Sequence, residues 1–293
     1  MASTGLRNPH FRLFAGAFLI SFSPVFVRLV SVPATTSAFY RTVFGGFVLV
    51  LFLLARRGRR VPRRGIRIAL ASAAVFFALD LWFWHRSVLL IGPGLSTLLA
   101  NLQVFFMIAA GVLLFREKPG WIQIVAAPLA LAGLVLILGP DWSSLGAGYR
   151  LGVVLGLLTA MSYAGYLLCL RRARRGAGDS LPLVEVATVS VAVAFLLGVT
   201  ALAEGSSFAI PSLADLGWLL AYGVLAHAVG WMLIASSLTE VTAAEVGIAL
   251  LLQPALSLLW DGLIFGREFG TIELSGVALT LTAIFLGSQR RVP

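Results

Sequence analysis

The stretch Leu98–Glu117, LLANLQVFFMIAAGVLLFRE, returns later in the chain as Ala249–Glu268, ALLLQPALSLLWDGLIFGRE. Each copy is a long apolar run that contains one glutamine and stops at an Arg-Glu pair. Two prolines, Pro33 and Pro182, keep a similar offset ahead of the two copies. Together these matches predict an internal duplication, because a fixed spacing shared by several landmarks is the sign of a repeated unit.

The composition places the chain in a membrane. Of its 293 residues 59% are hydrophobic and only 12% charged, whereas soluble proteins carry about 25% charged residues. The excess of 22 Lys+Arg over 12 Asp+Glu does not indicate a nucleic-acid partner, because the cations cluster in short segments between apolar runs. The single Cys169 excludes an internal disulfide and a multi-cysteine metal site. No motif indicates a cofactor.

The apolar runs have the length of membrane-spanning helices. A helix needs roughly 20 apolar residues to cross roughly 30 Å of hydrocarbon, and open strands would leave backbone amides unpaired in lipid. We therefore expect an all-α integral membrane protein with ten transmembrane helices. The ten segments are 11–30, 35–55, 66–90, 94–115, 119–138, 149–169, 182–203, 212–237, 242–264 and 269–288.

The arginines predict the orientation. Placing the N-terminus in the cytoplasm puts the clusters at 56–67 and 171–175 on the inside, so both termini are expected to be cytoplasmic. Five spans per half is an odd number, and the second half would therefore enter the membrane upside down. The prediction is two inverted five-helix repeats, 1–140 and 141–293, around a central cavity near the membrane midplane, as in many secondary transporters.

Three short motifs resemble the EamA-type branch of the drug/metabolite transporter superfamily: ISFSPVFVRL in the first span, AFYR opening the second, and Gln253-Pro254 in the ninth. Within that branch the chain is most similar to the YddG-type exporters of aromatic amino acids. The resemblance implies a transporter, not an enzyme, that exports small amphipathic metabolites across the bacterial inner membrane by alternating access. Exporters of lipophilic cationic drugs are the alternative. Gln103-Val104 stands where the second copy has Gln253-Pro254, so the two halves should not bend alike there.

Asp80 is the most informative polar residue, because a carboxyl group inside a bilayer is costly. It lies near the middle of the third span, on one helical face with Phe77 and Trp84. It can anchor a substrate ammonium group or take up a proton. The alternative is a structural pair with Arg28, Arg41 or Arg86.

Other polar and aromatic residues lie at similar depth. Arg41 can bind a carboxylate through two hydrogen bonds, snorkel outward, or hold Asp80. His227 can contact the substrate or a backbone carbonyl, and the amides of Asn101, Gln103 and Gln253 can bind a polar head group or join helices. Aromatic rings would receive the side chain of an amino acid. The expected substrate-binding residues are Arg41, Asp80, Trp82, Trp84, Asn101, Tyr163, Tyr166, His227, Trp231 and Gln253.

The expected partners are a small-molecule substrate and membrane lipid, and the oligomeric state is left open. An intramembrane enzyme is a remote alternative. An aspartyl protease would need Asp80 and Asp261 to face each other in one water-filled site.

Overall fold

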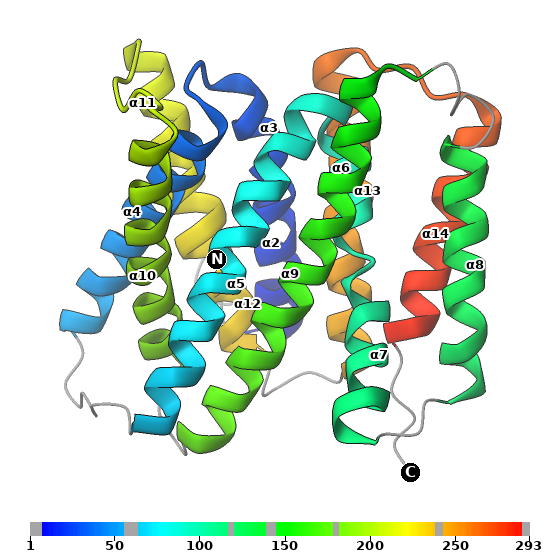
Figure 1. The fold of residues 1–293 in the computed structure, drawn as a ribbon, viewed down its shortest axis with the longest axis horizontal. Coiled ribbons are helices and arrows are strands. Elements are labelled where there is room, and N and C mark those ends of the chain that lie inside the picture. Colours follow the sequence, from blue (N-terminus) through cyan, green and yellow to red (C-terminus); the bar gives the residue numbers. More distant parts are fainter. Residues whose placement is uncertain are drawn as a thin grey trace.

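The protein is a bundle of helices, with no strand among the residues that the structure describes (Figure 1). The computed structural model describes residues 8–55, 64–116, 120–138, 145–177, 182–237 and 243–288. The helices are α2 Pro9–Ser21, α3 Ser23–Leu29, α4 Ala34–Ala55, α5 Arg64–Ile91, α6 Pro93–Ala100, α7 Gln103–Phe115, α8 Trp121–Leu138, α9 Ala147–Ala177, α10 Pro182–Ala203, α11 Leu213–Ala221, the π-helix η1 Tyr222–Gly230, α12 Trp231–Ser237, α13 Ala243–Phe265 and α14 Thr271–Ser288.

Seven stretches of this described part are long and apolar enough to cross a membrane. They are Pro9–Leu29, Ala34–Ala55, Gly65–Ile91, Pro93–Leu113, Ala147–Leu170, Leu183–Ala203 and Leu213–Ile234. Three shorter apolar helices, Ile124–Ile137, Leu252–Phe265 and Thr271–Leu286, coincide with the remaining expected segments. The chain is therefore a multi-pass helical membrane protein, and ten crossings remain a prediction.

Local sequence signals set where several helices begin. Asn8 precedes α2, and its side chain accepts hydrogen bonds from the backbone amides of His10 (2.9 Å) and Phe11 (3.4 Å). Ser212 does the same for Asp215 (3.0 Å) at the start of α11. These contacts satisfy amides that a helix leaves unpaired in its first turn. Pro9, Pro93 and Pro182 occupy first helical positions, where a missing N–H costs nothing.

The most extensive contacts between helices join the two predicted halves. Helices α5 and α9, α4 and α10, and α8 and α14 pack side by side, each pair combining one helix from 1–140 with one from 141–293 (Figure 1). Glycines permit the approach of α8 and α14, because a Cβ on Gly276 would lie 2.6 Å from the carbonyl oxygen of Gly133. The predicted halves are thus interlocked. Their expected boundary at residue 140 and most of the arginine cluster at 56–67 lie outside the described residues.

The outer surface of the bundle is apolar. Large hydrophobic side chains are strongly exposed on several helices, including Leu113 (78%), Phe195 (70%), Leu202 (70%) and Leu263 (70%). Polar side chains are instead buried between helices, among them Arg41, Asp80, His85, His227 and Asp261. This inverted distribution is the one expected where lipid, not water, surrounds the protein.

Three of the expected spans are interrupted. The first breaks at Phe22, between α2 and α3, one residue before the Ser23-Pro24 pair. The fourth breaks at Asn101-Leu102, between α6 and α7. The eighth contains the π-helix η1, whose wider turns are frequent at functional sites. The ninth span, α13, is the counterpart of the fourth in the predicted repeat, and it runs through Pro254 without interruption. The fourth and ninth spans therefore bend differently, but the break lies in the fourth span, which has no proline at this point.

Candidate functional site

A cavity of about 80 Å³ lies where the interrupted helices meet. Both predicted halves supply its walls. The lining residues are Ile20, Ser23, Pro24, Arg41, Phe77, Asp80, Leu81, Trp84, Thr97, Ala100, Asn101, Gln103, Thr159, Tyr163, Trp231, Leu250 and Gln253. This volume exceeds what one water needs but is well below the roughly 300–1,000 Å³ of a typical ligand cleft. An organic substrate would require the cavity to widen.

Seven of the ten expected site residues line this cavity: Arg41, Asp80, Trp84, Asn101, Tyr163, Trp231 and Gln253. The other three lie nearby in different surroundings. Trp82 is on another face of α5, where its indole N–H donates to Glu204 (2.6 Å). Tyr166 is buried and its ring stacks on Phe77, with 4.5 Å between centroids. His227 is buried behind the wall, with its Nε2 2.9 Å from the hydroxyl of Ser190.

Asp80 contributes a carboxyl group to the cavity. It is 7% exposed and faces the cavity. Within the described part of the chain, no side chain or amide hydrogen-bonds to it. The structural alternative required Arg28, Arg41 or Arg86 beside it. Arg28 and Arg86 instead contact Asp261 and Glu204. Arg41 donates to Tyr222, but it lines the same cavity as Asp80 and acts on the Asp80 carboxyl group electrostatically, so a structural pair with Arg41 stays an alternative. Asp80 is the acidic residue in the lining of this cavity, and its oxygens are available to accept hydrogen bonds from a ligand.

Arg41 supplies the opposite charge. Its side chain is buried, and Nη1 donates to the hydroxyl of Tyr222 at 2.9 Å. Its Nε is buried without a hydrogen-bond partner. The guanidinium carbon lies 4.9 Å from the ring centroid of Tyr222 and 5.9 Å from that of Trp84. A guanidinium held in this way retains donors that a carboxylate can use.

The remaining polar groups present acceptors and donors around the same space. Asn101 donates through its amide nitrogen to the carbonyl of Thr97 (2.8 Å), which leaves the amide oxygen available. Gln103 Oε1 and Ser23 Oγ are buried and have no hydrogen-bond partner. Buried polar atoms are normally satisfied, so these are further places where a ligand or water can bind. Within the described part of the chain, no cluster of His, Cys, Asp and Glu could hold a metal ion.

Sequence reasoning missed several residues of this region. Ser23 and Thr97 line the cavity but are small hydroxyl residues in apolar spans, where they usually bond to their own helix backbone. Tyr222 is fully buried, and nothing in the local sequence separates it from an ordinary core aromatic. The signal that identifies it is its contact with Arg41, which only the packing of two distant helices creates.

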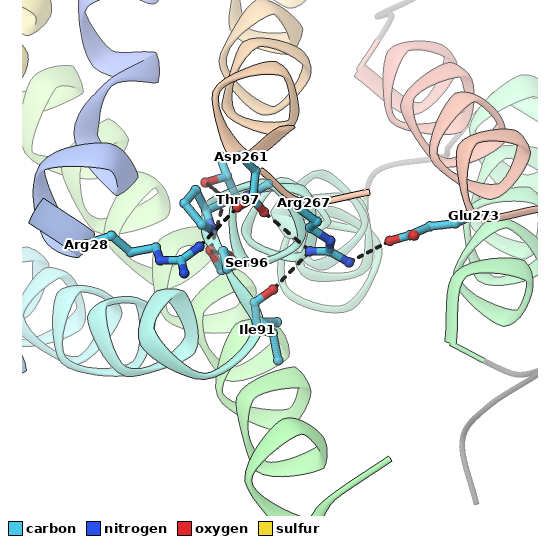
Figure 2. Close-up of polar contacts among 10 residues, drawn as sticks. Arg28, Ile91, Ser96, Thr97, Asp261, Arg267 and Glu273 are labelled. Carbon is cyan, nitrogen blue, oxygen red and sulfur yellow. Dashed lines mark hydrogen bonds and ion pairs between the residues drawn. The ribbon is translucent and has the colours of Figure 1, made fainter. Parts of the chain in front are cut away.

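Two polar clusters lie outside the cavity lining, one near the C-terminal end of α13 and the other just after α10. In the first, Asp261 of α13 is fully buried and accepts hydrogen bonds from Arg28 (3.2 Å) and Arg267 (3.4 Å) (Figure 2). Arg267 also contacts Glu273 of α14 at 2.6 Å and the carbonyl of Ile91 at 3.1 Å. Burial opposes the charge of Arg267, but the neighbouring carboxylates outweigh it and raise its pKa above the ordinary value. Asp261 thus joins helices far apart in sequence and is not among the residues that line the cavity with Asp80.

The second cluster surrounds Glu204, just after α10. Its carboxylate accepts hydrogen bonds from Thr35 (2.6 Å), Trp82 (2.6 Å) and Arg86 (2.7 Å). Partial burial opposes the charged form, but these hydrogen bonds and the charge of Arg86 outweigh it. The pKa of Glu204 is consequently held below its ordinary value of 4.5. This cluster fastens α4, α5 and α10 together.

The fold defines a multi-pass membrane protein whose buried cavity is lined by charged, polar and aromatic side chains. The profile of the EamA-like transporter family matches residues 9–139 and again residues 150–288. The chain belongs to the EamA-like transporter family, whose members transport small molecules across membranes.

Two further likenesses agree with this assignment. An uncharacterized protein of Pseudomonas aeruginosa is 29% identical over 259 residues, which cover 86% of this chain and 85% of that protein. A solved crystal structure superposes with a TM-score of 0.66 at 18% identity, covering 95% of this chain and 97% of that one. The second likeness concerns the fold alone.

Proposed function

We propose that this transporter exports small amphipathic metabolites, best represented by aromatic and other hydrophobic amino acids, across a bacterial inner membrane. The observation that carries the proposal is a cavity that holds both charges: the carboxyl group of Asp80, which accepts no hydrogen bond in the described part of the chain, and the guanidinium of Arg41, which has spare donors. A zwitterionic amino acid needs both. Its ammonium group would bind Asp80, its carboxylate would bind Arg41, and its ring would lie against Trp84, Tyr163 or Trp231.

The proposed mechanism is alternating access between two inverted repeats of five helices. Three observations support it. One family profile matches the chain twice, the cavity draws its walls from both halves, and the helix contacts follow the expected symmetry. Helix α5 of the first half packs on α9 and α10, and the corresponding η1–α12 segment of the second half packs on α2 and α4. The small cavity volume fits a state that must open further to admit substrate.

The test is counterflow of labelled phenylalanine into proteoliposomes that contain the purified protein. Arg41→Gln is expected to raise the half-saturating concentration roughly tenfold to a hundredfold, because a charge-assisted hydrogen bond contributes about 1.5–3 kcal/mol. Asp80→Asn should impair the same flux. Arg150→Gln is the matched control, since Arg150 is an exposed residue at the start of α9 and its side chain bonds only to the carbonyl of Leu145 among the contacts described.

The alternative substrate class is a lipophilic cation, which the Asp80 carboxyl group and the aromatic residues of the cavity wall would also bind. It gives a different pattern in the same assay. If Arg41→Gln keeps full activity while Asp80→Asn loses transport of a lipophilic ammonium ion, the cation reading replaces ours. Absence of phenylalanine counterflow in the unmodified protein would exclude the amino-acid proposal altogether.

A further inference from the structure

Arg41 is the first member of a buried chain of hydrogen bonds. Its Nη1 donates to the hydroxyl oxygen of Tyr222 at 2.9 Å. That hydroxyl lies 3.1 Å from Nε2 of His85, whose Nδ1 lies 2.7 Å from the carbonyl oxygen of Leu81. Tyr222 and His85 are both fully buried. Neither residue lines the cavity, so they act on the candidate substrate space through the wall residues that they contact, which are Arg41, Leu81 and Trp84.

The direction of every bond in this chain is fixed by its two ends. The carbonyl of Leu81 can only accept, so Nδ1 of His85 carries the hydrogen. The guanidinium of Arg41 can only donate, so it uses a lone pair of the Tyr222 oxygen. The Tyr222 hydroxyl hydrogen is then free to point at Nε2 of His85, which accepts it in the neutral imidazole. Tyr222 and His85 thus each accept one hydrogen bond and donate one, and every hydrogen between the two ends of the chain is used.

Close packing brings the members of the chain together. Helix α4 and the π-helix η1 approach at two glycines, Gly45 and Gly223. A Cβ on Gly223 would lie 2.9 Å from the amide nitrogen of Gly45 and 3.1 Å from the carbonyl oxygen of Arg41. Real side chains do not tolerate the first of these distances. Because Tyr222 directly precedes Gly223, this contact places the Tyr222 hydroxyl beside the Arg41 side chain.

One donor of Arg41 remains conspicuously open. Nε is buried and without a partner, although buried polar atoms nearly always have one. With Nη1 fixed on Tyr222, the guanidinium cannot turn away freely to satisfy Nε elsewhere. A carboxylate oxygen arriving from the cavity would supply the missing acceptor. An arginine that is held at one corner is also preorganised, so less side-chain entropy is lost when the anion binds.

We propose that Tyr222 and His85 are positioning residues that hold the Arg41 guanidinium toward the cavity and thereby set the preference for substrates that carry a carboxylate. This inference rests on the proposed function, since it assigns a role in amino-acid selectivity to residues behind the site. It goes further by predicting that a hydroxyl that never touches the substrate controls the choice between an amino acid and the corresponding amine.

The experiment compares Tyr222→Phe with Tyr40→Phe. Both substitutions remove one phenolic hydroxyl and keep the ring. The Tyr40 hydroxyl donates to the carbonyl of Phe208 at 2.7 Å and does not touch Arg41, so it is the matched control. Dissociation constants of phenylalanine and of phenethylamine, which lacks the carboxylate, are measured by calorimetry on the purified protein. Arg41→Gln defines the loss expected when the guanidinium is absent.

Tyr222→Phe is expected to weaken phenylalanine binding roughly fivefold to tenfold and to leave phenethylamine binding within about twofold, because only the carboxylate depends on the orientation of Arg41. Tyr40→Phe should change neither. An equal weakening of both ligands would mean that Tyr222 merely supports the fold, and no weakening of either would mean that Arg41 is held without it. Both results overturn the positioning role.

The same series separates this inference from the proposed function. If Arg41→Gln weakens phenylalanine binding while Tyr222→Phe does not, the positioning role fails and the proposed function stands. If the unmodified protein shows no preference for phenylalanine over phenethylamine, both proposals fail.

Discussion

We expect Asp261→Asn to destabilise the protein, because Asp261 of α13 holds together α3, α6 and the segment that precedes α14. The Asp261 carboxylate is fully buried and holds three donors from separate parts of the chain (Figure 2). These are Arg28 at 3.2 Å, Arg267 at 3.4 Å and the backbone amide of Gly94 at 3.2 Å. Asparagine preserves the size of the side chain and one acceptor oxygen, but it removes the charge that both guanidinium groups face.

The size of the loss follows from the exposure of the partners. Removing one member of a buried ion pair costs about 3–5 kcal/mol, whereas an exposed pair contributes about 0–1 kcal/mol. The side chain of Arg28 is 38% exposed and that of Arg267 is 22% exposed. Both contacts therefore fall between these limits. We expect Asp261→Asn to lower the free energy of unfolding by roughly 2–4 kcal/mol.

The assay is thermal unfolding of the purified protein in detergent, followed by tryptophan fluorescence at one fixed scan rate. The matched control is Glu273→Gln, because Glu273 is also a carboxylate paired with Arg267 but its side chain is 21% exposed. The melting temperature should fall by roughly 5–15 °C for Asp261→Asn and by no more than roughly 3 °C for Glu273→Gln. Equal shifts in the two variants would show that burial of Asp261 does not make it the centre of this network.

Two further perturbations test the packing and the second polar cluster. Gly45→Ala would place a Cβ 2.7 Å from the carbonyl oxygen of Gly223 and against the ring of His227. We expect this substitution to lower the free energy of unfolding by about 1–3 kcal/mol and to lower the melting temperature. Gly217→Ala is the control and should not lower it, because its Cβ meets nothing within 4 Å. Because the pKa of Glu204 is depressed in the folded chain, its contribution to stability is present at neutral pH and is lost as the pH falls through the folded-state pKa. Glu204→Gln should therefore show a smaller drop in melting temperature than the unmodified protein between neutral pH and roughly pH 3, and an identical drop would rule out this source of acid sensitivity.

Much of the fold was accessible from the sequence because the membrane leaves few choices. Long apolar runs without strands must become helices, and helix is found within each of the expected segments. Where the runs are interrupted was harder to predict. Pro254 does not end α13, while the break at Asn101-Leu102 occurs without a proline. Tertiary packing determines such breaks, and the sequence of an apolar run does not indicate where they occur.

Part of the site could be predicted from the sequence, because a polar residue within an apolar span is easy to recognise. Asp80 and Arg41 stood out for that reason, and both line the cavity. Trp82 and His227 stood out equally but lie behind it or on another face, because the sequence gives the depth of a residue more readily than its direction. Which amides and rings belong to the substrate site stays a prediction until binding is measured on variants.

The nine residues of η1 change the angular relation between the two ends of their helix. An ordinary α-helix advances about 100° per residue, and the wider π turn advances less. Trp218, before η1, faces the ring of Phe26 with 6.2 Å between centroids, while Trp231, after it, reaches the cavity. The π turns therefore fix a rotational offset between the segments on either side that differs from the offset of an α-helix of the same length. Loss of one residue within Tyr222–Gly230 would leave the membrane span nearly as long but would turn Trp231 toward a different neighbour, so this stretch is far less tolerant of deletion than of substitution.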